Sequence, residues 1–241
     1  GNRKATNEYI NLLNVYYHRW QGSAPIVSRI EPSPKAEAMP EHLKETVKHE
    51  LPPKTASTMA GLSEIIDNFE QSYGQWAAFI DQVKNTKLSF ECDQAHAHNG
   101  RAALRITYEI APESWALCSL VYQHPRNWKS FKGLTVYLHA LRVGQPAIII
   151  AYQGKSSDNL SHFEFRMKTG KDAVTGWQRV DIPWDRFTQA AWEGDGTAKF
   201  DPSSSMGLAF SFEADESGGH TGKLWVDDVT LLSAKGSAKG K

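Results

Sequence analysis

Alternation of apolar and polar side chains at every second residue is the feature that most constrains the fold of this chain. The pattern recurs from residue ~62 onward, and its clearest stretches are 104–110, 134–139, 162–167 and 208–213. In an extended strand, successive side chains point to opposite faces, so each stretch has one core face and one solvent face. The sequence therefore predicts half-buried β-strands over most of residues 62–233.

The spacing of these stretches narrows the fold class. Clusters of turn-forming residues separate them at 98–100, 154–159, 169–176 and 216–219. The intervals are too short for the crossover helices that parallel strands require. We therefore expect an all-β domain at 62–233, an antiparallel β-sandwich of the jelly-roll type. The stretch 148–152 departs from the pattern because it is apolar on both faces.

The first 61 residues have a different composition. Residues 1–21 include one amphipathic helix whose stripe consists of Tyr9, Leu12, Leu13, Tyr16, Tyr17 and Trp20. We expect this stripe to pack on the sandwich or on a neighbouring domain, with a membrane-surface or partner-binding helix as the alternative. Residues 22–61 contain six prolines and many charged residues, which is linker composition. Residues 234–241 form a short basic tail.

Charge and cysteine content exclude several functional classes. Lys plus Arg and Asp plus Glu both number 27, so the formal net charge is zero. Nucleic-acid binding normally requires a basic face, and the body of the chain has no stripe of Lys and Arg. No apolar run is long enough to span a membrane. Two cysteines, Cys92 and Cys118, do not make a thiol zinc site, and the sequence leaves open whether they pair.

Three motifs in order carry a resemblance to a known family. They are Asp67-x-Phe69-Glu70, Trp177-x-x-Val180-x-Ile182-Pro183 and Val226-Asp227-Asp228-Val229. With the strands between them, residues 62–233 resemble the family 11 carbohydrate-binding modules and related jelly-roll domains, including that of complex I intermediate-associated proteins. The resemblance implies a non-catalytic module that binds a β-glucan-type polysaccharide in a groove on the concave sheet. It also indicates an extracellular or cell-surface location, with the periplasm as an alternative.

The resemblance also implies a set of binding residues. His162 matches a groove histidine, Asn159 falls near an aspartate before it, and the family's Arg, Asp and Tyr cluster falls near Ala190, Trp192 and Glu193. Arg166 and Tyr137 are added because they face the polar side of their strands, so the predicted ligand-binding residues are Trp192, His162, Asn159, Arg166, Tyr137 and Phe79. Each could instead be a solvated or packing residue.

The match to the family is incomplete. The family's groove tyrosines fall near Phe79, Ser114 and Phe212, and its second groove histidine falls at Ala209. The ligand therefore differs, or the groove is vestigial or covered by another domain.

The resemblance suggests a structural Ca²⁺ where the first and last strands meet. Calcium requires several oxygen ligands, and Asp67, Glu70 and Asp227, with Asp228 beside it, come from those strands. The alternative is two solvated acidic strand edges. His96 and His98 could ligate a transition metal, but no third ligand is evident.

The sequence carries no catalytic motif, and its many acidic residues show no spacing that selects a glycosidase pair. We therefore expect a binding module rather than an enzyme, attached to a catalytic or scaffold domain of a larger glycan-active or cell-surface protein. The alternative is a structural or protein-interaction sandwich without glycan binding of its own. An open groove with His162 and Trp192 accessible would favour the first function. Cover over these two positions, or an apolar concave face, would favour the second.

Overall fold

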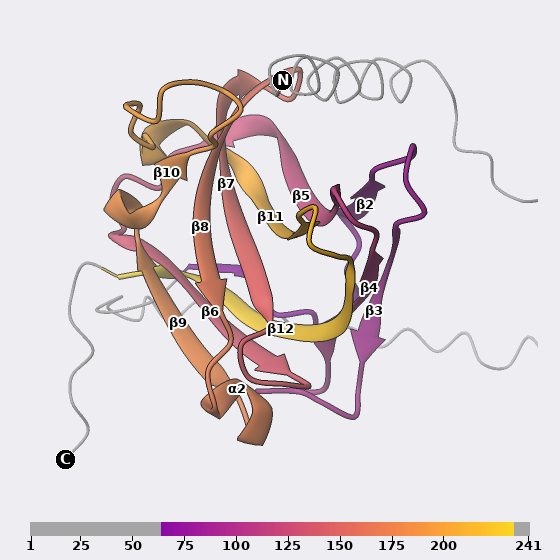
Figure 1. Cartoon of the computed structure of the whole chain (residues 1–241). Helices are drawn as coiled ribbons and strands as arrows, with labels where there is room; N and C mark the ends of the chain where they lie inside the picture. Colours follow the sequence, from indigo (N-terminus) through magenta and orange to yellow (C-terminus); the bar gives the residue numbers. More distant parts are fainter. Residues whose placement is uncertain (1–63, 234–241) are drawn as a thin grey trace, which may run out of the picture. The chain divides into compact units, whose positions relative to one another are not determined.

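The computed structural model describes residues 64–233, which form two antiparallel β-sheets packed face to face (Figure 1). The predicted all-β sandwich is therefore confirmed. The predicted helix within 1–21, the linker at 22–61 and the tail at 234–241 lie outside the described residues. Among residues 64–233, no helix is long and apolar enough to cross a membrane.

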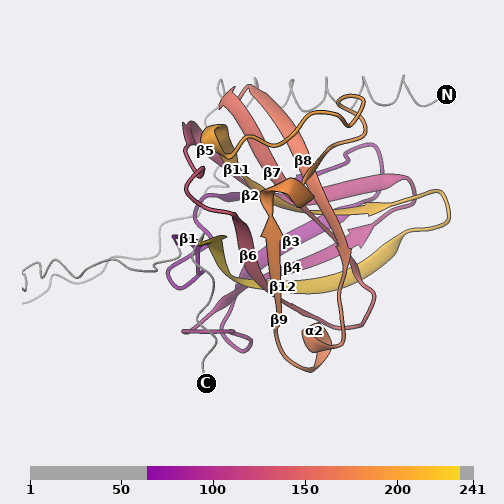
Figure 2. The same ribbon diagram turned by 90° about the vertical axis from the view of Figure 1, so that its left-hand side faces the viewer.

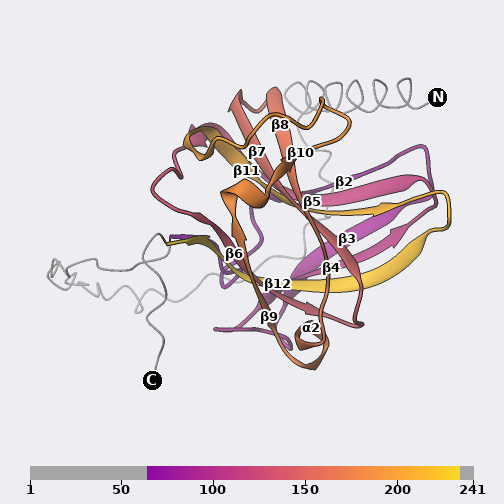
Figure 3. The ribbon, with the colours of Figure 1, turned by 60° about the vertical axis from the view of Figure 1, so that its left-hand side comes forward.

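Sheet A contains the last long strand of the domain at its centre. Its order is β3 (Lys87–Asp93), β4 (Ala103–Ile110), β12 (His220–Leu232), β6 (Gly133–Ala140) and β9 (Gln178–Pro183), and β1 (Ile65–Asp67) also pairs with β12. Figures 2 and 3 show β12 running between β4 and β6. The first and last strands of the domain are therefore neighbours, as the sequence suggested, with Ile65 opposite Thr230.

Sheet B forms the other layer. Its order is β10 (Thr188–Gln189), β8 (Asn159–Lys168), β7 (Pro146–Ser156), β11 (Ser205–Ala214), β5 (Ser114–Arg126) and β2 (Trp76–Ile80). Three short helical turns lie in the connections, at α2 (Asp172–Thr175), η2 (Trp184–Arg186) and η3 (Pro202–Ser204). Turns of this length cannot cover a sheet, so side chains between the two sheets make the core.

The core consists of the inward members of each alternating stretch. Leu104 and Ile106 of β4 face it from sheet A, and Ile149 of β7 and Phe210 of β11 face it from sheet B, all at 1% exposure or less. Aromatic rings join the layers, because Tyr108 of β4 stacks on Phe212 at 4.0 Å between ring centroids. Such pairs contribute about 0.5–1.5 kcal/mol each beyond the apolar area that they bury.

Two cysteines lie in different sheets and are free thiols, Cys92 on β3 and Cys118 on β5. Burial raises the pKa of both thiols, most strongly that of Cys118. The sequence left open whether Cys92 and Cys118 pair, and in the structure they do not.

Candidate functional site

The predicted binding residues are divided between the two sheets. His162 and Arg166 lie on β8 and Phe79 on β2, all facing outward from sheet B, while Tyr137 lies on β6 in sheet A. The structure does not bring Tyr137 and His162 into one groove, because the two side chains belong to opposite layers of the sandwich. Sequence spacing could not show this, since it gives a strand's two faces but not its sheet.

Asn159 also does not join the predicted set. It begins β8 opposite Ser156, in the exposed turn between β7 and β8. Side chains alternate along a strand, so Asn159 and His162, three residues apart, belong to opposite faces of β8.

Trp192, one of the predicted ligand-binding residues, lies beside His162 at a corner of sheet B. The two rings are 4.7 Å apart between centroids. Both residues are only partly exposed, and the side chain of His162 is 13% exposed. The loop that carries Trp192 follows β10 and is fastened to β8 by the Ala190 amide, which donates to the His162 carbonyl at 2.9 Å.

Glu193 holds the His162 ring in place. One carboxylate oxygen accepts from the His162 backbone N–H at 2.8 Å, and the other contacts the ring nitrogen Nδ1. Because a carboxylate only accepts hydrogen bonds, Nδ1 carries the proton that it donates, and Nε2 of the neutral ring presents a lone pair. We define His162, Trp192 and Glu193 as the β8 corner.

A network of charged side chains continues along β8 from this corner. Arg166 contacts Glu164 through Nε at 2.8 Å and Glu213 of β11 through Nη1 at 2.9 Å. Glu164 is 5% exposed, and its burial raises the pKa of its carboxyl, an effect that the Arg166 guanidinium opposes. The outer edge of β8 therefore combines one half-exposed arginine with carboxylates that it neutralises.

The centre of the same face is apolar. Its buried residues are Leu117, Ile148, Ile150, Tyr152, Met206 and Ala209, and the partly buried Phe79, Trp115, Val121 and Leu160 pack against them. Few polar groups interrupt this surface; Ser119 Oγ donates to the Tyr152 hydroxyl at 3.1 Å. The sequence indicated this feature through the stretch 148–152, which is apolar on both faces. An apolar centre offers little to the hydroxyls of a polysaccharide chain.

Of the three positions matched to groove tyrosines, only Phe79 lies on this face. Phe212 is buried between the sheets at 1% exposure. Ser114 is also buried, and its hydroxyl hydrogen-bonds Thr86 at 2.5 Å. A shift of one residue in strand register moves every side chain of the strand to the opposite face. An error of one residue in matching this sequence to the family therefore places a residue on the wrong face.

The carboxylates predicted to bind calcium are engaged by N–H donors. Asp67 accepts from the Trp76 indole at 2.8 Å, and Glu70 accepts from the Arg101 amide at 2.8 and 2.9 Å. Asp227 is fully buried and accepts from the His98 amide at 2.8 Å. Within residues 64–233 no group of three or more His, Cys, Asp or Glu side chains is arranged to hold a metal ion. The arrangement does not fit a calcium site, and calcium stays an untested prediction.

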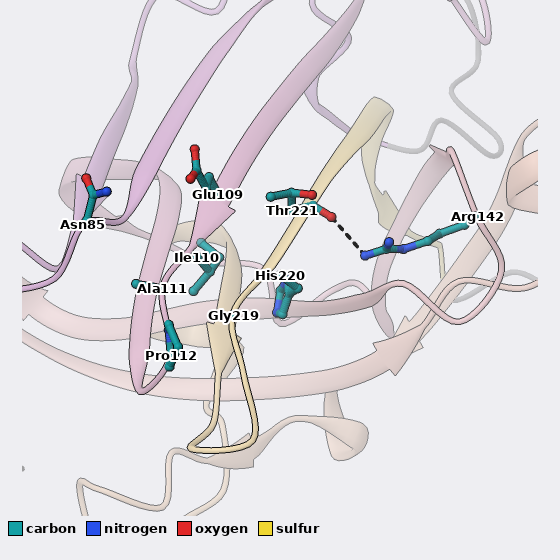
Figure 4. A pocket seen from close by; sticks show the side chains of 9 residues that line it. All are labelled: Asn85, Glu109, Ile110, Ala111, Pro112, Arg142, Gly219, His220 and Thr221. Atoms are coloured by element: carbon teal, nitrogen blue, oxygen red, sulfur yellow. Dashed lines mark hydrogen bonds between the residues drawn. The ribbon is translucent and has the colours of Figure 1, made fainter.

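An open pocket lies away from all the predicted binding residues. Figure 4 shows it between the β4–β5 turn, the β6–β7 turn and the start of β12. Glu109, Arg142 and His220 line it, and Arg142 donates to the Thr221 carbonyl at 2.9 Å across its wall. The Tyr108 ring lies 5.6 Å from His220, and two buried polar atoms of this pair, Tyr108 Oη and His220 Nδ1, have no hydrogen-bond partner in the described part of the chain. A buried water is the ordinary partner for such atoms.

An aromatic cluster that was not predicted from the sequence lies on the outer face of sheet A. Tyr137 stacks under His98 with ring centroids 3.6 Å apart, and Trp177 lies 5.7 Å from both His98 and His139. His96 lies over Trp225 of β12 at 4.8 Å. We define His96, His98, Tyr137, His139 and Trp177 as the aromatic–histidine patch. The available signals were the alternation of Tyr137 with His139 and the pair His96-x-His98.

Comparison with known proteins relates this fold to glycan-binding modules. A family 11 carbohydrate-binding module of the Clostridium thermocellum cellulosomal cellulase Lic26A-Cel5E superposes with a TM-score of 0.60 at 12% identity, over 74% of this chain and 99% of that one. The fold resembles that of family 11 carbohydrate-binding modules. Another solved structure of such a module, in complex with a β-1,3-1,4-mixed-linked tetrasaccharide, gives a TM-score of 0.57 at 14% identity, covering 74% of this chain and 100% of that one.

A second family is similar. A family 30 module of the cellulosomal cellulase Cel9D-Cel44B from Clostridium thermocellum has a TM-score of 0.52 at 16% identity, over 73% of this chain and 99% of that one. No protein-family model matches the sequence, and no curated protein matches it. At these identities the likeness concerns the fold, so function has to be argued from the residues of this chain.

Proposed function

We propose that this domain is a non-catalytic carbohydrate-binding module that takes a β-glucan-type polysaccharide at the β8 corner. The observation that carries the proposal is the Trp192 ring held against His162, whose orientation Glu193 fixes. The fold that presents this corner is shared with glycan-binding modules. We further propose an extracellular or cell-surface location, beside a catalytic or scaffold domain.

The chemistry of the corner suits a sugar ring. The apolar face of a pyranose packs on an aromatic ring, and planar polar side chains make hydrogen bonds to its hydroxyls. His162 Nε2 can accept from a hydroxyl, and Arg166, 54% exposed, retains N–H groups that can donate. Desolvating many hydroxyls opposes binding, so we expect modest affinity.

Affinity electrophoresis on soluble polysaccharides tests this proposal. The panel contains mixed-linkage β-glucan, xyloglucan and mannan, and compares the whole chain with Trp192→Ala and His162→Ala. The matched control is Tyr73→Ala, because Tyr73 is an exposed aromatic residue whose ring contacts Phe90 of β3 in sheet A. We expect β-glucans to retard the wild-type chain and the control equally, and to retard the two corner variants less, because each variant weakens the corner site about tenfold. Retardation that all four proteins share would place binding elsewhere.

A second candidate is a protein-interaction sandwich, which the apolar centre of sheet B favours. The partly buried Phe79, Val121 and Leu160, which pack around the buried cluster, give this face apolar side chains suited to an apolar partner rather than to hydroxyls. If no polysaccharide of the panel retards the folded chain, this second function replaces the first.

A further inference from the structure

We propose that the aromatic–histidine patch on the outer face of sheet A is a second carbohydrate-binding site, separate from the β8 corner. The patch joins three parts of the chain that are distant in sequence. Tyr137 and His139 come from β6, His96 and His98 from the β3–β4 loop, and Trp177 from the segment between α2 and β9. Figure 2 shows α2 beside the ends of β6 and β9, where this segment lies.

Asp93 and Trp225 lie beneath the rings of the patch and hold them in position. Asp93 of β3 accepts from the Trp225 indole at 2.8 Å and from Arg105 at 3.1 Å, and it contacts His96 Nδ1 at 3.2 Å. These donors, the indole first, lower the pKa of the Asp93 carboxyl to about 2. The ring of Trp225 is 3% exposed under His96 and His139. A ligand would therefore meet rings that are already held in place.

All three histidines have one ring nitrogen committed to an oxygen. His98 Nδ1 contacts Asp228 at 2.8 Å, and His139 Nδ1 donates to the Gly176 carbonyl at 2.6 Å. With His96 on Asp93, each Nδ1 faces an oxygen that only accepts, which places the proton there and leaves Nε2 of the neutral ring as an acceptor. The hydrogen bonds of these three rings within the described residues all use Nδ1, and the side chains of His96 and His98 are 46% and 27% exposed, so hydroxyl donors can reach these two rings.

A donor group lies next to the rings. Arg179 of β9 is opposite Tyr137 in register and pairs with Asp181 at 2.9 Å. The side chains of this pair are 45% and 43% exposed. The patch therefore combines aromatic rings, outward ring acceptors, a guanidinium and a carboxylate, which is the combination that binds an uncharged sugar ring.

Other ligand classes fit less well. Asp93, Asp227 and Asp228 border the patch, and their negative charge disfavours phosphate-bearing ligands such as nucleotides. A metal is disfavoured because no suitable group of three ligands occurs in residues 64–233.

The test is calorimetric titration of the whole chain with mixed-linkage β-glucan, xyloglucan and mannan oligosaccharides. The variants are Trp177→Ala, Arg179→Ala and, for the other face, Trp192→Ala. Arg179 is half-exposed, so its replacement reports on the patch even if Trp177→Ala disturbs the loop; circular dichroism checks the fold of each variant. We expect two sites per chain, of which Trp177→Ala and Arg179→Ala each weaken one by about tenfold.

The possible results separate this inference from the proposed function. If only Trp192→Ala reduces binding, the β8 corner stands and the second site is overturned. If only the patch variants reduce it, the patch stands and the β8 corner is wrong. If the folded wild-type chain binds no oligosaccharide, both fail.

Discussion

The two outer faces of the sandwich use similar residue types in opposite ways. On sheet B, aliphatic side chains fill the centre, and the polar groups His162, Glu164 and Arg166 are confined to the β8 edge. On sheet A, the centre itself carries rings and acids, with Tyr137 and His139 on β6 and Trp225 on β12. The face that corresponds to the expected groove is therefore the more apolar of the two.

This difference shows that the sandwich fold by itself does not determine the chemistry of an outer face. Both sheets need one apolar side for the core, and that requirement leaves the outer sides unconstrained. In this chain the outer side of sheet B has an apolar centre, while aromatic and histidine rings lie together on the outer side of sheet A. Four predictions test this contrast, and they follow in order of expected effect.

The largest effect is expected at the centre of sheet B. Ile150 is 4% exposed, so Ile150→Ala should lower the free energy of unfolding by about 2–4 kcal/mol. The matched variant on sheet A is Thr107→Ala, an outward residue of β4 whose loss should cost less than about 0.5 kcal/mol. Urea denaturation measures both. Equal, small losses would show that the centre of sheet B contributes no more to stability than an ordinary surface.

The stability contributed by sheet A should depend on the ionised carboxylate of Asp93. Asp93 has a pKa of about 2 in the folded chain against 3.8 for an ordinary Asp, so folding favours its charged form. The resulting stability, about 2 kcal/mol, is present above pH ~4 and is lost as the pH falls towards 2. Asp93→Asn should remove this pH dependence and destabilise the protein at pH 7. Glu109→Gln, at an exposed ion pair with Lys87, is the control that should change little.

A smaller effect is expected at the β8 edge. Arg166→Ala leaves the buried Glu164 without its cation and should cost about 1–2 kcal/mol at pH 7. Burial already raises the Glu164 pKa, so folding favours its neutral form, and the penalty should grow as the pH rises from 4 to 7. The double variant Glu164→Gln with Arg166→Ala should recover part of the loss. Thermal unfolding across this pH range would contradict the account if the penalty were constant.

The smallest effect is expected from calcium. The carboxylates of Asp67, Glu70 and Asp227 already accept from N–H groups, so adding millimolar CaCl₂ or EDTA should shift the melting temperature by less than about 1 °C. An occupied structural site would raise it by several degrees, because about 2–3 kcal/mol of binding linkage corresponds to such a shift. Scanning calorimetry with both additives distinguishes the two results.

The fold was predictable because its signal is local. The alternating stretches became β4, β6, β8 and β11, since the period of two follows from strand geometry alone. The sites were less predictable because they depend on pairing across the chain. Tyr137 and His162 both lie on the polar side of an alternating stretch, yet the strand order places them in different sheets. The link between His98 and Asp228 joins residues 130 apart and involves a backbone of positive φ at Asp228, which no local pattern reveals.

The central claim is that sugar binds at the β8 corner, and mapping by nuclear magnetic resonance tests it most directly. A mixed-linkage β-glucan tetrasaccharide is titrated into the ¹⁵N-labelled whole chain, and backbone amides and tryptophan indole signals are followed. The account predicts large shifts at Trp192, His162 and Glu193, separate from those expected at the aromatic–histidine patch, with the apolar centre of sheet B little affected. Shifts absent from these three residues at saturating sugar would contradict it.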